Sequence, residues 1–143
     1  MRIRYWCASG GRHPVLGQVW HRFSEAEGPE AERYTRYVCN ALSFVARSPS
    51  ECERVVEAFV AVQSGIQRDA TVEGEDVTLR LSPQGVQVDI EVNEAWIGKQ
   101  EGRFSLSEYL VALRAWREFL LIPEGPGAEF RIELPVSIPS STQ

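Results

Sequence analysis

The sequence has no long hydrophobic run and few cysteines. Its longest apolar run spans only a few residues, whereas a membrane-spanning helix needs roughly 20 apolar residues. The first residues, MRIRYWCASGGRHP, also lack the continuous hydrophobic region of a secretory signal. The cysteines are odd in number and lie in apolar surroundings, which favours buried free thiols in a reducing compartment: Cys7, Cys39 and Cys52. We therefore expect a cytoplasmic protein with no membrane partner.

Histidine is equally scarce, which bears on metal and enzyme chemistry. The only two histidines, His13 and His21, lack the short paired spacing typical of zinc ligands, so we expect no metal and no cofactor. Cys7 lies on the inward side of a predicted strand and Cys39 in the middle of a predicted helix. Neither position favours a nucleophile that His13 would activate. No pair of carboxylates stands out as an acid–base pair, and we do not expect an enzyme.

Acidic residues are absent from residues 1–24, which contain four arginines, and abundant afterwards. Beyond Ser24 the chain has all 20 of its acidic residues and 11 basic ones, and its net charge is −5. The densest acidic segment, residues 69–94, has seven acids and one base, Arg80. A mostly acidic surface disfavours phosphate backbones, so we do not expect a nucleic-acid partner. Such a segment would instead attract a basic protein.

Length and patterning predict one α+β domain over residues 1–143, because domains commonly have roughly 100–150 residues. The predicted elements are a basic strand and long connection over 1–28, a helix pair over 29–65, a hairpin over 76–93, a core helix over 105–121 and a last strand over 128–136. A short second strand is expected near 15–23. We expect a mostly antiparallel sheet of about four to five strands, with three helices packed on one face.

The helix pair is indicated by the residues at its ends. Pro29 is favoured in the first turn of a helix. The run SPSE begins a second helix, with Ser48 as the N-cap and Glu51 completing a capping box. Gly65 is a natural terminator.

The hairpin is the clearest part of the β pattern. VTLRL and VQVDIEV alternate apolar and polar residues, and the SPQG between them is typical of a turn. One register places all the apolar side chains, Val92 included, on one face of the hairpin. It pairs Leu81 with Val86, Leu79 with Val88 and Val77 with Ile90. Asp89 and Glu91 are then expected to point to solvent.

The stretch GRFSLSEYLVALRAWREFL, residues 102–120, predicts a core helix. Ser105 and Glu108 match a capping box, and Phe104 and Tyr109 match a hydrophobic staple. One helical face carries the large apolar residues Leu106, Tyr109, Leu110, Leu113, Trp116 and Leu120. Glu108, Arg114 and Glu118 are expected on the outer face.

The acidic hairpin is the predicted partner-binding surface. Its residues are expected to form an acidic patch with an adjacent aromatic side chain, a composition typical of interface hot spots: Asp76, Asp89, Glu91, Glu94 and Trp96. A solvated sheet face with no partner is the alternative at this position. A second hypothesis places a small-molecule or enzymatic site in the N-terminal connection, around Arg12, His13 and His21.

The segment VEGEDVTLRLSPQGVQVDIEVNEAWIGKQEGRFSLSEYLVALRAWREFL adds a resemblance. The order of features resembles small bacterial immunity proteins of polymorphic or contact-dependent toxin systems. It consists of a helix pair, an acidic hairpin and then the pattern G-x-F-S-L-S-E-Y-x-x-A-L-x-x-W-x-x-F-L. The likeness covers roughly 44–121. It implies a tight inhibitor of a cognate toxin, a partner that would be basic. A further alternative is an interaction subunit of a phage or host assembly, including a homodimer.

Overall fold

The computed structural model describes residues 1–134 of the chain. Its seven strands are β1 (Arg2–His13), β2 (Gly17–Glu27), β3 (Ala70–Glu73), β4 (Val77–Ser82), β5 (Gly85–Ile90), β6 (Arg103–Phe104) and β7 (Glu129–Glu133). Its α-helices are α1 (Ala31–Tyr34), α2 (Ala41–Val45), α3 (Pro49–Gln63) and α4 (Leu106–Leu121). A π-helical turn, η1 (Thr35–Asn40), joins α1 to α2, and 3-10 turns form η2 (Glu94–Trp96) and η3 (Gln100–Gly102).

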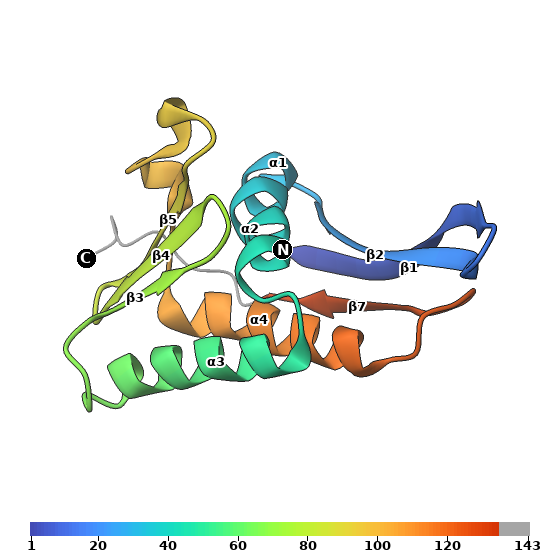
Figure 1. Ribbon diagram of the computed structural model, residues 1–143. Coiled ribbons are helices and arrows are strands. Elements are labelled where there is room, and N and C mark those ends of the chain that lie inside the picture. The colour runs from blue at the N-terminus through green and yellow to red at the C-terminus, as the bar shows by residue number, and fades with distance from the viewer. Residues whose placement is uncertain (135–143) are drawn as a thin grey trace.

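The strands form two antiparallel sheets, and the α+β class predicted from the sequence is confirmed. One sheet has the order β2-β1-β7 and the other the order β3-β4-β5-β6. The first helical segment, residues 31–45, stands between the two sheets, while α3 and α4 run side by side beneath it (Figure 1). The predicted three helices correspond to this segment, α3 and α4. The strands number more than expected because the N-terminal connection and the segment before the hairpin are also extended.

The N-terminal region differs from the predicted long connection. β1 and β2 form one long hairpin whose register runs from Arg2–Glu27 to His13–Gly17, with an irregularity between Ser9 and Arg12. We call this hairpin the N-terminal ribbon. β7 covers β1 only along Arg2 to Trp6, so the rest of the ribbon projects beyond the sheet (Figure 1). The predicted short strand near 15–23 is therefore part of a longer one.

The acidic hairpin has the predicted register. Leu81 pairs with Val86, and the two further apolar pairs follow as expected, Leu79 with Val88 and Val77 with Ile90. Gly85 at the turn has a φ of 138°, and a Cβ there would lie 2.4 Å from the carbonyl oxygen of Phe104. Glycine is thus required where β6 pairs with β5.

The helices begin and end close to the predicted residues. α1 starts at Ala31 rather than at Pro29, because Glu30 adopts a left-handed conformation with a φ of 62°. Ser48 caps α3 by accepting a hydrogen bond from the Glu51 amide, as predicted. The Glu51 carboxylate, however, accepts from the amide of Arg47 and not from that of Ser48.

α4 is the core helix that the sequence predicts. Ser105 caps it by accepting from the Glu108 amide, and the Phe104 and Tyr109 rings lie 5.7 Å apart, as a staple requires. Its side chains reach the elements around it: Tyr109 donates to the carbonyl of Tyr37 and Trp116 to that of Ala46. Their hydroxyl and indole groups are therefore paired within the core.

Glu108 is not on the outer face of α4, contrary to the prediction. Its side chain is buried, and its carboxylate accepts a hydrogen bond of 2.8 Å from the Tyr34 hydroxyl. Burial and this hydrogen bond raise the pKa of Tyr34 to about 12. Tyr34 belongs to α1, so the contact fastens the start of the first helical segment to the start of α4.

The last strand lies where the sequence predicts it, within the described residues. β7 covers Glu129–Glu133 and pairs with β1, so the two ends of the described chain lie in one sheet. The remainder of the predicted strand, residues 135 and 136, lies outside the described residues.

Candidate functional site

The strongest candidate site is a groove between the first helical segment and the end of the acidic hairpin. We call it the helix–hairpin groove. It has a volume of about 400 Å³ and is lined by Ala31, Glu32, Thr35, Arg36, Asn40, Ala41, Phe44, Val77, Ile90, Val92 and Trp96. Several of the residues come from η1, a π-helical turn of the kind that often occurs at functional sites. The lining is mostly apolar, so the groove suits side chains rather than water.

Trp96 forms one wall of the groove and is held in place by Arg36. The Arg36 guanidinium lies 4.5 Å from the centre of the Trp96 ring, and it also donates to the Glu32 carboxylate at 3.2 Å. The cation–π contact and the ion pair fix the indole against the helix. The groove therefore has a preorganised aromatic wall.

Asp89 anchors the loop that carries Trp96 and lies beneath the surface rather than on it. The residue is only 3% exposed. One carboxylate oxygen accepts from the Gly98 amide at 2.8 Å and the other from Arg80 at 2.9 Å. The prediction that Asp89 points to solvent is wrong, because residues 91–99 fold back over that position. The contact raises the pKa of the Arg80 guanidinium above its usual value.

Gln87 provides a second anchor for the same loop. Its side-chain amide donates to the carbonyl of Lys99 at 3.0 Å and accepts from Arg103 at 2.7 Å. Asn93 caps η2 by accepting from the Ala95 amide. Asp89 and Gln87 of β5 thus both hold the loop just after Trp96, at Gly98 and Lys99.

The other predicted acidic residues remain exposed beside the groove. We call Asp76, Glu91 and Glu94 the acidic rim. Asp76 precedes the lining residue Val77, Glu91 lies between Ile90 and Val92, and Glu94 begins the turn that ends at Trp96. The Glu91 amide donates to the Asp76 carbonyl at 2.7 Å, which places these two residues together.

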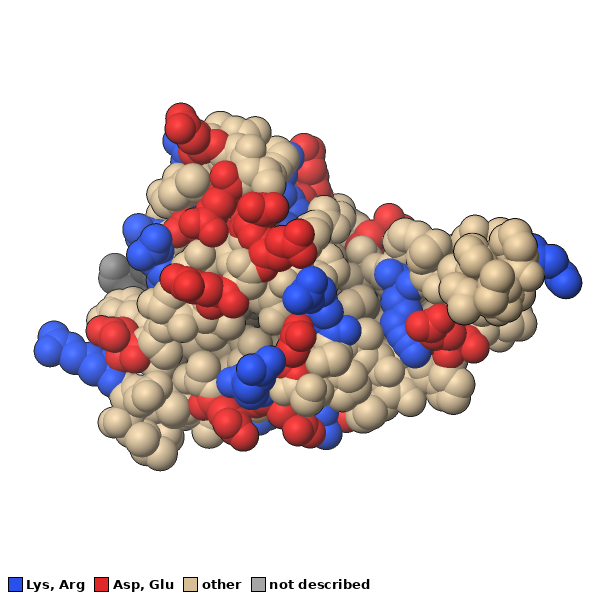
Figure 2. All heavy atoms as spheres, viewed as in Figure 1, with Lys and Arg blue, Asp and Glu red and all other residues tan. Residues whose placement is uncertain are grey.

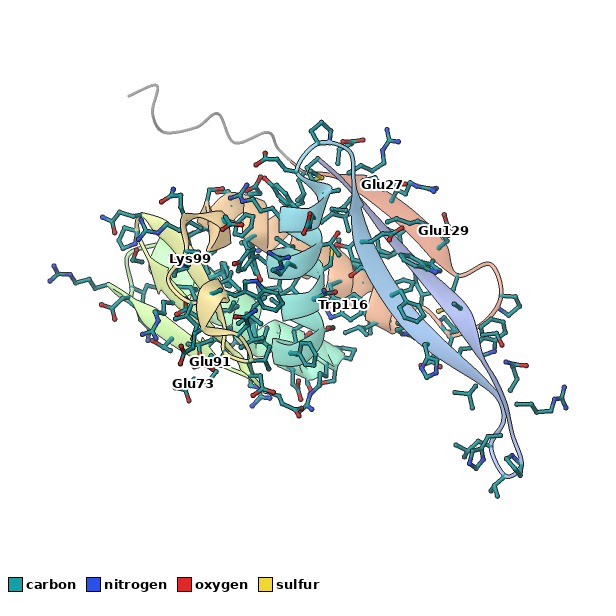
Figure 3. The ribbon with its side chains drawn as sticks, turned by 90° about the horizontal axis from the view of Figure 1, so that it is seen from above. Glu27, Glu73, Glu91, Lys99, Trp116 and Glu129 are labelled. Atoms are coloured by element: carbon teal, nitrogen blue, oxygen red, sulfur yellow. The ribbon has the colours of Figure 1, made fainter. Side chains whose placement is uncertain are left out.

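The acidic rim belongs to a wider acidic surface. Figure 2 shows acidic side chains gathered over the β4–β5 part of the molecule. Figure 3 shows Glu73 and Glu91 together at one end of this sheet, with Lys99 farther along. Thr78 links the two acids, since it pairs with Glu73 across the strands and donates to the Glu91 carboxylate. The surface therefore offers negative charge next to an apolar groove.

Sequence reasoning named only Trp96 as a site residue among the residues that line the groove, and three of the others show why. Phe44 and Arg36 lie off the apolar stripe of the first helical segment, and an exposed phenylalanine beside that stripe was the available signal. Val92 was assigned to the buried face of the hairpin, but β5 ends at Ile90 and Val92 is 65% exposed. An apolar residue beyond the last strand pair is free to serve a binding surface.

The alternative site residues lie on the N-terminal ribbon. Arg12 and His13 are exposed near its turn, where the His13 ring accepts from the amides of Val15 and Leu16. His21 pairs with Ala8 across the strands, and its ring lies over Gly10, where a Cβ would be 2.3 Å from its Nε2. His13 therefore stabilises the turn and His21 packs on the ribbon backbone, and none of the three lines the helix–hairpin groove.

Cysteine and metal chemistry find little support in the described residues. Cys39 and Cys52 are buried free thiols, and burial raises their pKa to about 12 and about 11. Between residues 1 and 134, no group of three or more metal-ligating side chains is placed to hold a metal ion. In the same residues, no helix combines the length and apolarity needed to cross a membrane.

No protein-family model matches the chain, and neither the curated proteins nor the solved structures include a significant match.

Proposed function

We propose that the protein is a non-enzymatic immunity or inhibitor protein, which binds a cognate toxin in the bacterial cytoplasm. The observation that carries this proposal is the apolar helix–hairpin groove with Trp96 in its wall and exposed acids on its rim. Apolar pockets with an aromatic anchor and a charged rim are typical of protein-binding hot spots. The occupant would be an apolar side chain of the toxin, flanked by arginine or lysine.

The acidic rim would act mainly on the rate and selectivity of binding. Long-range attraction steers a basic partner to an acidic surface and makes the association rate fall with salt. The groove would then supply the lasting contact. By covering the toxin's active site, the protein would exclude the toxin's substrate.

The test is affinity capture of the tagged protein from its native cells at low salt, with matched variants. The groove variant combines Trp96→Ala with Glu94→Lys, and the control variant is Glu57→Lys, an exposed acid on α3. A stoichiometric partner should be retained by the control and lost by the groove variant. With the purified partner, Trp96→Ala should raise the Kd by about thirtyfold or more, the effect of a hot spot worth at least 2 kcal/mol.

Inhibition is tested separately from binding. One equivalent of protein should abolish the activity of the captured partner, and the groove variant should not. A partner that both variants retain would place the interface elsewhere. A partner that is bound through the groove but stays fully active would favour the second candidate, an interaction subunit of a larger assembly.

A further inference from the structure

We propose that the helix–hairpin groove receives the tip of the N-terminal ribbon from a second copy of this chain. The two surfaces are complementary in charge and in polarity, and they lie at opposite ends of one molecule. This inference concerns the protein alone, and a partner that binds in the groove would displace the tip of the second copy.

The ribbon ends in a tip that has large exposed apolar side chains. We define the tip as residues 12–17, the turn and its flanking residues; Val15 is 86% exposed and Leu16 73% exposed. Beyond the reach of β7 the ribbon is a two-stranded hairpin, and such hairpins are at best marginally stable in water. A surface that covers the tip would therefore stabilise the projecting part.

The groove offers an apolar surface that would cover the exposed side chains of the tip. Phe44, Val92 and Trp96 line it, and the first two are exposed. At about 30 Å³ per water molecule, its volume holds on the order of a dozen water-sized groups. That is more than the side chains of one valine and one leucine fill.

The charges of the two surfaces are opposite. The first acid in the chain is Glu25, and the tip contains Arg12, which is exposed. The groove is bordered by the acidic rim, while Glu32 and Arg36 in its lining pair with each other. With Val15 and Leu16 in the groove, Arg12 would lie close to the rim carboxylates, where opposite charges attract.

One molecule cannot make this contact with itself. The ribbon points away from the sheet of β3 to β6, with the first helical segment between them, in both views of the fold (Figures 1 and 3). The contact therefore joins different surfaces of two copies. Such a head-to-tail contact produces a closed ring or an open chain, depending on the rotation between copies.

The experiment is sedimentation of the pure protein over a concentration series, with two variants. The tip variant is Val15→Ser with Leu16→Ser, and in this experiment the groove variant is Phe44→Ser with Val92→Ser, in place of the one used for partner capture. All four positions are exposed. Circular dichroism melts check that both variants fold. The control is Ile66→Ser, which removes an apolar side chain that is 80% exposed at another site. Wild type and control should associate as concentration rises, and each variant alone should stay monomeric.

Mixing the two variants gives the decisive result. The groove variant still has an intact tip and the tip variant an intact groove, so an equimolar mixture should form a 1:1 dimer and nothing larger. Association of the wild type should weaken from about 0.1 M to about 1 M salt, as the Debye length falls from about 10 Å to about 3 Å. Arg12→Glu should weaken it in the same way at low salt.

Two results would overturn the proposal. One is a wild-type protein that stays monomeric at every concentration. The other is a wild type that associates while the mixed variants do not, which indicates a contact between like surfaces, such as the edges of β2. A failure of the proposed function leaves this experiment unaffected, because only the chain itself is measured.

Discussion

At the scale of single residues, Asp89 has the most consequence for the site. It is buried, and it accepts from the Gly98 amide and from Arg80. Hydrogen bonds to charged groups contribute about 1.5–3 kcal/mol each. We expect Asp89→Ala to lower the free energy of unfolding by about that amount or more, and to free the Trp96 loop. Urea denaturation measures the first effect, and acrylamide quenching of tryptophan fluorescence the second.

The matched control for Asp89 is Glu91→Gln, an exposed acid on the same hairpin. Surface substitutions of this kind usually stay within about 0.5 kcal/mol. Equal losses in the two variants would contradict the anchoring role. By the same reasoning, Asp89→Lys would reduce partner binding through disruption of the loop, so the rim must be tested at Glu91 and Glu94.

Glu108 gives a second prediction at this scale, because its carboxylate is the acceptor for the buried Tyr34 hydroxyl. Glu108→Ala leaves that hydroxyl without its partner, which costs about 1–3 kcal/mol of stability. In a double-mutant cycle with Tyr34→Phe, the losses should be less than additive, as expected of residues in contact. Chemical denaturation of the four proteins measures this coupling. Full additivity would show that the bond contributes nothing to stability.

These two acids also show where sequence reasoning stops at the residue scale. The periods of a strand and of a helix predict which face of its own element a side chain lies on, and nothing about other elements. Position 89 does lie on the outer face of its sheet, and residues 91–99 then cover it. Glu108 meets Tyr34 from a distant helix. Burial produced by another part of the chain leaves no periodic signal in the local sequence.

At the scale of elements, the cap of α4 is the best test of the predicted helix. Ser105 accepts from the Glu108 amide at 3.1 Å, and loss of such a cap costs about 0.5–2 kcal/mol. We expect Ser105→Ala to lower the unfolding midpoint accordingly. Ser107→Ala is the control: it lies in the same turn, is exposed, and its hydroxyl accepts only a surface hydrogen bond from Gln63, so it should cost less. Thermal denaturation of both variants provides the measurement, and equal shifts would contradict the capping role.

Elements with strong local signals could be predicted, and those without could not. The turn at SPQG and two apolar-alternating runs were enough for the register of β4 and β5. In the N-terminal ribbon only the alternation in RIRYWC and a short stretch near 15–23 indicated strands, because glycines at positions 10, 11 and 17 and an irregular register interrupt the pattern. The pairing of β7 with β1 also depends on contacts between the two ends of the described chain. Patterns predict that strands exist but not which distant strands pair.

At the scale of the whole molecule, the tyrosines link the fold to pH. Burial is the main cause that raises the pKa of all four, Tyr5, Tyr34, Tyr37 and Tyr109, and the pKa of Tyr34 reaches about 12. In the unfolded chain a tyrosine has a pKa of about 10. Above that pH the unfolded chain loses protons that the folded chain keeps. Stability is therefore fully present below about pH 10 and falls as the pH rises towards 12.

Two measurements check this alkaline loss. Tyrosinate absorbance should stay low near pH 10 and then rise together with loss of circular dichroism, since ionisation follows unfolding. Each tyrosine that ionises only on unfolding lowers stability by at most about 1.4 kcal/mol per pH unit. Tyr34→Phe removes one such group, so its stability should fall less steeply between pH 10 and 12, whatever its stability at pH 7. Tyrosinate that forms near pH 10 in the intact fold would contradict the buried positions. Because Tyr5 lies in β1, Tyr37 in η1 and Tyr109 in α4, a single cooperative transition would also show that these three elements unfold as one unit.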